Sequence, residues 1–327
     1  MKKIFKENFK FILCLILIIL IFTLKFPYYI DAPGGISNIA SKFEIDGYES
    51  SGTFNLAYVK EYKATIPTLL VSLFNKDWNV LKEEDVLLEN EDNTSYLIRD
   101  KIFMDESISN AINVAYKYAK KDIEITSSKI LITYIDKNSN TDLKVGDEIL
   151  YINGNSIKEK KDIEKIVNEK NIGDKINIKV INDGKEYDRY AYITLSEGSK
   201  KIGILISHIM EYKTNPNIES KIDSNESGPS GGLIMSLYIY DSLIKEDLTK
   251  GLTIVGTGTI DLDGNVGSIG GVEYKLKSAV KENADLFIVP KDENYEEALK
   301  IKKENNYNIE ILGVSTFDEV IKYLNNK

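Results

Sequence analysis

Three glycine clusters in the last third of the chain each lie beside a hydroxyl or amine side chain. The first is Gly228 to Gly232 around Ser230, the second is Gly256 to Gly258 around Thr257, and the third is Gly270-Gly271, shortly before Lys275. Glycine allows a backbone to turn sharply or to approach another group closely. The pattern therefore predicts an active site assembled from three loops, at which a serine, a threonine and a lysine meet.

Ser230 is the candidate nucleophile. Pro229 suits the first turn of a helix, and Leu233 and Leu237 give that helix a buried face. Unpaired backbone N–H groups and the helix dipole favour negative charge at such an N-terminus, which is what an oxyanion requires. The expected donors are the backbone N–H groups from Gly228 to Ser230. Taken alone, the pattern also fits an ordinary capped helix.

Lys275 is the candidate general base, because it lies at the rim of an apolar helix face formed by Val272, Leu276 and Ala279. Burial disfavours an ammonium ion, so the pKa of this amine would fall from about 10.4 towards about 7–8, as a base at neutral pH requires. Thr257 would hydrogen-bond the amine and orient it. A surface lysine whose stem lies along apolar side chains is the alternative.

The elements around these residues follow from periodicity. A helix is predicted over residues 104–120, with Asp105 or Ser107 at its start. Strands are predicted over residues 53–59, 285–290 and 309–314, and helices over residues 295–303 and 317–324. Strands that alternate with helices indicate an α/β domain.

Together, the three clusters resemble the proteolytic domain of the Lon family, and the 18 positions from Thr257 to Lys275 are in keeping with that family. The resemblance implies that Ser230 is the nucleophile and Lys275 the general base. The residues that would support them are Thr257, Gly228, Pro229 and Gly231. An acid often precedes the Gly-Pro-Ser of the family directly, whereas here Glu226 lies one step further back.

A compact unit over residues 125–198 interrupts the α/β pattern. A strand over residues 149–152 precedes the tight-turn pair Asn153-Gly154, and a helix near residues 160–171 and a strand near 175–181 follow. This order, with the run Leu-Lys-Val-Gly-Asp-Glu-Ile at residues 143–149, resembles a PDZ domain of the bacterial protease-associated kind. The resemblance implies a strand edge that accepts a peptide, formed by Lys129, Ile130, Leu131 and Ile132. A spacer domain without peptide binding is the alternative.

The N-terminal segment predicts a membrane anchor. Residues 11–24 are apolar apart from Thr23, and the stretch from Phe9 to Ile30 is long enough to cross a bilayer. No Ala-x-Ala-like cleavage site follows, which favours an anchor over a removed signal peptide and a secreted soluble protease. Lys2, Lys3, Lys6 and Lys10 precede the segment and predict a cytoplasmic N-terminus, with the rest of the chain outside.

The whole-chain composition excludes several classes of function. The net charge of −9 argues against binding nucleic acid through its phosphates. The single cysteine, Cys14, forms no internal disulfide, and the single histidine, His208, excludes a site with several histidine ligands. We expect no metal and no cofactor. No Gly-x4-Gly-Lys-Ser/Thr run for ATP binding occurs.

The predicted architecture has four parts. They are a cytoplasmic N-terminus and transmembrane anchor (1–30), the first part of a Lon-like domain (31–124), a PDZ domain (125–198) and the Lon-like catalytic part (199–327). The fold class is α/β (α+β), with the PDZ unit, a partly open β-barrel with helices, inserted into the protease domain and one N-terminal transmembrane helix. This order resembles the YlbL-like membrane proteases of Gram-positive bacteria.

The expected function is that of a membrane-anchored, ATP-independent serine endopeptidase that cleaves extracytoplasmic peptides or loosely folded proteins with a Ser230–Lys275 dyad. The alternative is a catalytically silent PDZ-type scaffold that binds peptides at the membrane. Expected partners are a peptide or unfolded protein and the membrane. Lon proteolytic domains form rings, so a homo-oligomer is a further candidate partner, and the sequence leaves the oligomeric state undecided.

Overall fold

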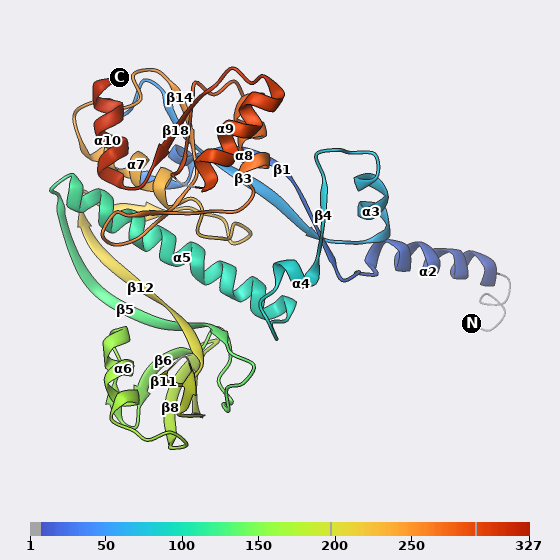
Figure 1. Ribbon diagram of the computed structural model, residues 1–327, viewed down its shortest axis with the longest axis vertical. Helices are drawn as coiled ribbons and strands as arrows, with labels where there is room; N and C mark the ends of the chain where they lie inside the picture. The colour runs from blue at the N-terminus through green and yellow to red at the C-terminus, as the bar shows by residue number, and fades with distance from the viewer. Residues whose placement is uncertain (1–7, 197, 292) are drawn as a thin grey trace.

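The chain folds into two lobes and a projecting N-terminal helix (Figure 1). The computed structural model describes residues 8–196, 198–291 and 293–327. The larger lobe uses segments from both ends of this range, and the smaller lobe is formed by the middle of the chain. One unit is thus inserted into the other. Lys2, Lys3 and Lys6, the predicted cytoplasmic lysines, lie outside the described residues.

A mixed six-stranded sheet is the centre of the larger lobe. Its strands, in spatial order, are β18 (Glu310–Val314), β17 (Leu286–Pro290), β14 (Thr253–Gly256), β3 (Thr53–Lys63), β1 (Tyr28–Asn38) and β4 (Asn79–Lys82). The strands from β18 to β3 are parallel, and β1 is antiparallel to both of its neighbours. Of the three glycine clusters, the one around Thr257 directly follows a strand of this sheet, β14.

Helices cover both faces of this sheet, which gives the larger lobe three layers. One face packs against α5 (Asn93–Tyr118), α7 (Gly232–Leu243) and α10 (Phe317–Asn326). The other face packs against α8 (Val272–Lys281) and α9 (Glu293–Asn305). Alternate side chains of β17 point into the two cores, Leu286 and Ile288 into the first and Phe287 and Val289 into the second. Near-continuous apolar strands are typical of sheets covered on both sides.

Short elements complete this lobe. They are η1 (Ile39–Ser41), β2 (Phe43–Ile45), α4 (Glu83–Val86), β13 (Ile218–Ser220), β15 (Thr259–Ile260) and β16 (Val266–Gly267). Helix α5 begins eleven residues before the predicted start, because Asp92 accepts a hydrogen bond from the backbone N–H of Ser95 and caps it there. The prediction that Asp105 or Ser107 begins this helix is therefore wrong.

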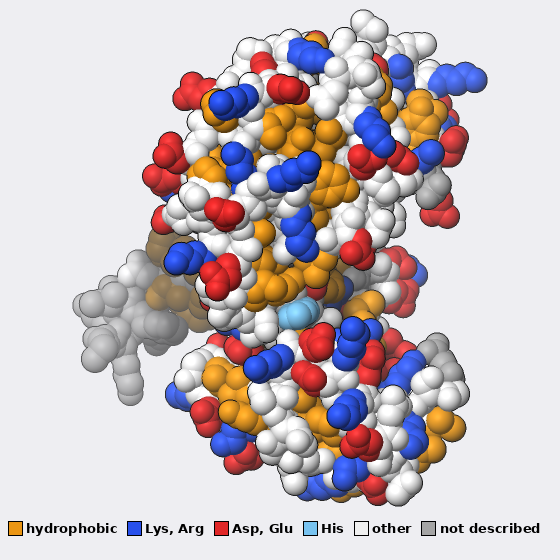
Figure 2. Space-filling view, turned by 90° about the vertical axis from the view of Figure 1, so that its left-hand side faces the viewer, with side chains coloured by type: hydrophobic (Ala, Val, Ile, Leu, Met, Phe, Trp, Pro, Cys, Tyr) orange, Lys and Arg blue, Asp and Glu red, His pale blue; other side chains and the backbone are white. Residues whose placement is uncertain are grey.

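Two long antiparallel strands connect the lobes. In this β5–β12 ribbon, β5 (Asp122–Ile135) and β12 (Ile204–Asn215) pair from Asp122↔Asn215 to Ile135↔Ile204. One half of the ribbon lies against α5 and the other half enters the smaller lobe. Figure 2 shows the two lobes meeting at a waist, with the single histidine, His208, beside it and charges of both signs dispersed over that face.

The smaller lobe is a curved antiparallel sheet closed by one helix. Its remaining elements are β6 (Glu148–Ile152), β7 (Asn155–Ser156), α6 (Lys160–Asn168), β8 (Lys175–Asn182), β9 (Lys185–Tyr192), β10 (Thr194–Ser196) and β11 (Ser199–Lys201). The strand order is β12-β5-β6-β8-β9. Asn153 and Gly154 both have positive φ, as the predicted tight turn requires. Isoleucines dominate the core of this lobe.

The N-terminal helix is shorter than the predicted membrane segment. Helix α2 spans Phe9–Thr23, and the following residues Tyr28–Asn38 form β1 of the larger sheet. The prediction of one apolar span from Phe9 to Ile30 is therefore wrong, because Tyr29 and Ile30 are buried in the larger lobe. Within residues 8–196, 198–291 and 293–327, no helix has the length and apolar character needed to cross a membrane.

Candidate active site

The loop that carries Ser230 is held by helix α5. The Gly228 N–H donates to the carbonyl of Asp100 (3.0 Å), and the Ser107 hydroxyl donates to the carbonyl of Pro229 (3.0 Å). Gly232 then begins α7, where an added Cβ would lie 2.9 Å from the Ser107 hydroxyl oxygen. The glycine is required here because helix and loop approach each other closely. Ser230 is partly exposed, whereas the first residues of α7 are buried.

Thr257 connects the serine loop to the sheet. It follows β14 and is fully buried, and its backbone N–H donates to the carbonyl of Ile288 in β17 (3.0 Å). Its hydroxyl donates to the backbone carbonyl of Ser230 (3.1 Å), and the Gly258 N–H donates to the same carbonyl (2.8 Å). Two hydrogen bonds therefore fix the position of the Ser230 backbone relative to the sheet.

Lys275 reaches the same threonine from the opposite layer. It lies in α8, is only 4% exposed, and its Nζ donates to Thr257 Oγ1 (3.2 Å). The hydrogen bond expected from the sequence is present. The structure thus links Ser230, Thr257 and Lys275 through the two hydrogen bonds of the Thr257 hydroxyl. The supporting residues Gly228, Pro229 and Gly231 flank Ser230 in the same loop.

Burial alone lowers the pKa of Lys275 to about 8, from an ordinary value near 10.5. An ammonium ion loses its hydration when it enters the core, so the neutral amine is favoured. A substantial fraction of Lys275 is therefore an unprotonated amine at mildly alkaline pH. This is the state in which a lysine accepts a proton from a hydroxyl group.

The expected oxyanion donors need a correction. The Gly228 N–H already donates to Asp100, and Pro229 has no N–H. Of the three residues proposed from the sequence, only Ser230 supplies an N–H that an oxyanion could accept. Glu226, the displaced acid, forms an ion pair with Lys42 and takes no part in the Thr257–Lys275 contact.

Asn294 is a residue that sequence reasoning missed. Its buried side-chain amide accepts a hydrogen bond from the backbone N–H of Ile269 (2.8 Å) and donates to the carbonyl of the same residue (2.9 Å). Ile269 directly precedes Gly270-Gly271, where α8 begins, so this double contact fixes the start of the helix that carries Lys275. The sequence offered one signal for this role, which is that Asn294 is a polar residue shortly after the buried strand Leu286–Pro290.

The predicted peptide-binding edge lies elsewhere and is occupied. Lys129, Ile130, Leu131 and Ile132 lie in β5, which pairs with residues 206–209 of β12 on one side. On the other side, Leu131 pairs with Glu148 of β6, and the Ile132 N–H donates to the carbonyl of Asp147 (2.9 Å). The prediction that this run accepts a peptide as an added strand is wrong, because both edges of β5 are already paired here.

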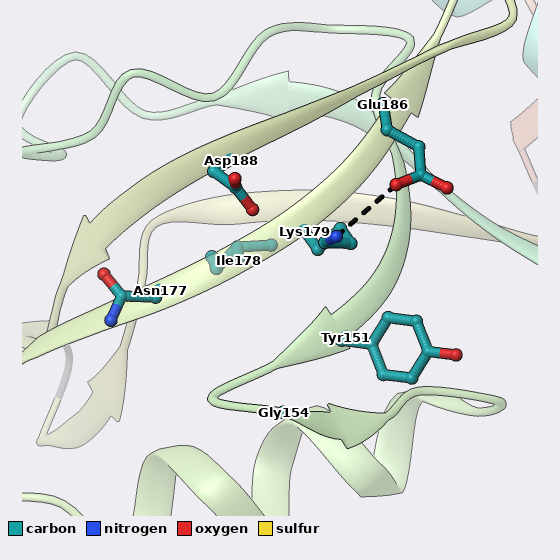
Figure 3. Close-up of a pocket in the computed structure, with 7 residues that line it drawn as sticks. All are labelled: Tyr151, Gly154, Asn177, Ile178, Lys179, Glu186 and Asp188. Atoms are coloured by element: carbon teal, nitrogen blue, oxygen red, sulfur yellow. Dashed lines mark hydrogen bonds and ion pairs between the residues drawn. The ribbon is translucent and has the colours of Figure 1, made fainter.

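A hollow of about 520 Å³ lies on the smaller lobe, away from Ser230 (Figure 3). Its lining side chains come from β6, β8, β9 and the turn at Gly154, and Lys179 and Glu186 form an ion pair across it (3.4 Å). The catalytic residues do not line this hollow. Among the residues that the structure describes, no group of three or more His, Cys, Asp or Glu side chains is placed to hold a metal.

Comparison with known proteins agrees with this geometry. Residues 222–326 match the Lon protease (S16) C-terminal proteolytic domain, and residues 111–189 match the PDZ domain. The chain carries a Lon-type proteolytic domain and a PDZ domain. The segment that matches the Lon-type domain contains Ser230, Thr257 and Lys275, and the PDZ match covers most of the smaller lobe.

The relatives of the Lon-type domain include Lon proteases. The chain is 33% identical over 153 residues to the Lon protease of Campylobacter jejuni, which covers 42% of this chain and 18% of that protein. It is 38% identical over 94 residues to Lon protease 2 of Bacillus subtilis, which covers 29% of this chain and 16% of that protein. The chain thus spans less than a fifth of either relative.

Solved structures that are similar to the chain include PDZ domains. One is the PDZ domain of an SdrC-like protein from Listeria monocytogenes, 21% identical, with a TM-score of 0.23. The match covers 25% of this chain and 92% of that domain.

Proposed function

We propose that this protein is an ATP-independent serine endopeptidase attached to a membrane, and that it cleaves extracytoplasmic peptides or loosely folded proteins. The observation that carries the proposal is the contact of the buried Lys275 amine with Thr257, whose hydroxyl also holds the Ser230 carbonyl (3.2 and 3.1 Å). A lysine buried in this way is a base near neutral pH, which a serine nucleophile needs in the absence of a histidine.

The proposed reaction begins with neutral Lys275. Its amine takes the proton of the Ser230 hydroxyl while the oxygen attacks the carbonyl carbon of a peptide bond. The Ser230 N–H stabilises the oxyanion that forms. The C–N bond then breaks as the Lys275 ammonium protonates the leaving amine. Water attacks the remaining ester, again with Lys275 as base, and regenerates the serine.

Thr257 has a positioning role in this scheme. Its hydroxyl hydrogen is donated to the Ser230 carbonyl, so its oxygen lone pair accepts from the Lys275 amine. The amine is therefore held at a fixed place beside the serine loop. Because each contact crosses between layers of the larger lobe, the site exists only when the sheet and its two helical layers are assembled.

Membrane attachment is proposed from the character of α2. Most of its large apolar side chains from Phe9 to Phe22 are exposed, and Ile12 and Ile21 are half-buried. The chain enters the larger lobe directly after this helix, so the catalytic lobe would lie close to the bilayer. With the lysine-rich segment on the cytoplasmic side, that lobe would act outside the cytoplasm.

The test is cleavage of casein by the full-length chain, purified in detergent, without ATP. We expect wild-type protein and Ser227→Ala to degrade casein, since Ser227 is an exposed neighbour of the site and a matched control. Ser230→Ala should be inactive, and so should Lys275→Arg, because a guanidinium does not act as a base at working pH. Casein cleavage that persists in Ser230→Ala would refute the dyad.

A catalytically silent PDZ scaffold is the second candidate function. It requires that the protein binds peptides without cleaving them. Peptide-library cleavage and peptide binding by the wild-type chain separate the two candidates. Binding with no cut peptide, in protein that circular dichroism shows to be folded, would support the scaffold.

A further inference from the structure

The connection between β3 and β4, which lie on either side of β1 in the sheet, presents an apolar tip to solvent. It contains helix α3 (Ile66–Ser72), which begins at a capping box formed by Thr65 and Thr68. Leu70 and Val71 are exposed on this helix, and Leu73 and Phe74 directly after it are 76% and 88% exposed. These last two are the most exposed large apolar side chains in the described part of the chain. We call Leu70, Val71, Leu73 and Phe74 the α3 tip.

The α3 tip is fixed beside the end of α2. The Phe26 N–H donates to the carbonyl of Ala64 (2.9 Å), and the Ala64 N–H donates to the carbonyl of Tyr28 (2.9 Å). These bonds join the residues that follow α2 to the residue that precedes the cap of α3. Helix α2 therefore lies against α3, and both project from the same side of the larger lobe (Figure 1).

The exposure of α2 indicates what covers this surface. Residues Leu15 to Leu20 are consecutive and all exposed, and consecutive residues of a helix point in directions about 100° apart. A single docked partner covers one face of a helix, whereas a bilayer covers all of them. A bilayer that surrounds α2 also reaches α3, because the two helices are in contact.

The length of α2 also favours a bilayer as the medium that covers the α3 tip. The 15 residues of α2 span about 22 Å at about 1.5 Å per residue, less than the roughly 30 Å of a hydrocarbon core. The α3 tip adds apolar surface at the end of α2 that faces the larger lobe. Beside it, Tyr62 and Trp78 stack with ring centroids 6.2 Å apart, and such aromatic residues are enriched at membrane interfaces.

We propose that the α3 tip inserts into the same bilayer as α2 and forms a second membrane contact that orients the catalytic lobe. This inference rests on the membrane attachment proposed above. The loop after α3 also reaches the catalytic helix, since Lys277 Nζ of α8 binds Asp77 Oδ1 (2.8 Å). The favoured substrates would be peptide bonds in segments that lie close to the membrane surface.

The test places a single tryptophan at the tip of the full-length chain. Trp78 is the only tryptophan, so Phe74→Trp in a Trp78→Phe background gives one reporter, and Tyr151→Trp in the same background is the control on the smaller lobe. Both are reconstituted into vesicles of phosphatidylcholine and phosphatidylglycerol, with or without brominated acyl chains. We expect brominated lipid to lower the emission of the tip reporter about twofold and to leave the control unchanged.

The outcomes separate the inference from the attachment on which it depends. Protein that does not float with vesicles refutes attachment and the inference with it. Protein that floats while the tip reporter stays unquenched refutes the inference alone.

A second measurement concerns substrates. The double variant Leu73→Ser, Phe74→Ser should cut a vesicle-tethered peptide several-fold more slowly than wild type. It should cut the same peptide free in solution at an unchanged rate. Equal slowing of both reactions would show that the tip binds substrate instead of lipid, and dimerisation lost in this variant would show that it binds a second copy. Either result overturns the proposal.

Discussion

Replacing Lys275 by methionine should make the protein inactive but more stable. Methionine keeps an unbranched side chain of similar length and removes the charge from a residue that is 4% exposed. The pKa of about 8 in the folded state lies below the ordinary value near 10.5, which disfavours the charged form by about 3 kcal/mol. At pH 7 the amine is mostly protonated in both states, so wild type carries about 3 kcal/mol of this cost.

Loss of the hydrogen bond to Thr257 offsets part of the gain, by about 1 kcal/mol. The expected net stabilisation at pH 7 is therefore about 2 kcal/mol. Between the folded pKa near 8 and the unfolded value near 10.5, the unfolded chain binds more protons, so wild-type stability rises with pH over this window relative to the variant. Near pH 9.5 the cost falls to about 1 kcal/mol, so the net advantage of methionine nearly disappears.

Urea unfolding of the full-length chain in micelles, followed by circular dichroism at pH 7 and 9.5, measures both quantities. Lys281→Met is the matched control, because Lys281 ends the same helix but is exposed, and it should change the free energy of unfolding by less than about 0.5 kcal/mol. If Lys275→Met gave no stabilisation at pH 7, or a gain independent of pH, the amine would not be a buried charge and the argument for its basicity would fail.

Three further outcomes follow from the site. The peptide cleavage rate should rise with pH to a plateau with a midpoint near 8, since only the neutral Lys275 amine accepts a proton, and a flat profile would contradict this. Asn294→Ala should lower kcat about tenfold with little change in KM, because it frees the backbone before α8, and Asn294→Asp should lose less. Gly271→Ala should lower the free energy of unfolding in urea by about 1–3 kcal/mol, because Gly271 has a φ of 70° and an added Cβ would lie 2.7 Å from Val59 Cγ2. Gly270→Ala is the control, because its Cβ meets open space, and it should cost less than about 0.5 kcal/mol.

The sequence was informative where a pattern is local. Lys275 lies at the rim of a helix face set by Val272, Leu276 and Ala279, so its burial follows from helical periodicity, and its lowered pKa follows from burial. The three glycine clusters are likewise local patterns, since each can be read from a few consecutive residues of the sequence. These features were predictable without knowledge of the tertiary fold.

Features that depend on pairing between distant segments were not predictable in this way. The run from Lys129 to Ile132 has the composition of a strand, but β12, which lies about 75 residues further along the chain, decides whether its edge is free. The first turns of α5 before Met104 lack a clear apolar stripe and are placed by the Asp92 cap and by the contact of Asp100 with Gly228. Asn294 acts on a backbone 25 residues away, which no periodicity encodes.

The β5–β12 ribbon makes the PDZ domain an exchangeable cassette. Its two strands leave and rejoin the larger lobe side by side, at Ser128 and Met210, which face each other in the ribbon. The entropy of closing a loop grows only slowly with its length, and a paired stem fixes the ends in advance. Evolution or an engineer can therefore replace the segment between Ser128 and Met210 by a tight turn or by another binding module. Such a replacement loses only local contacts, such as the hydrogen bonds of Ser207 and His208 to Glu106 of α5.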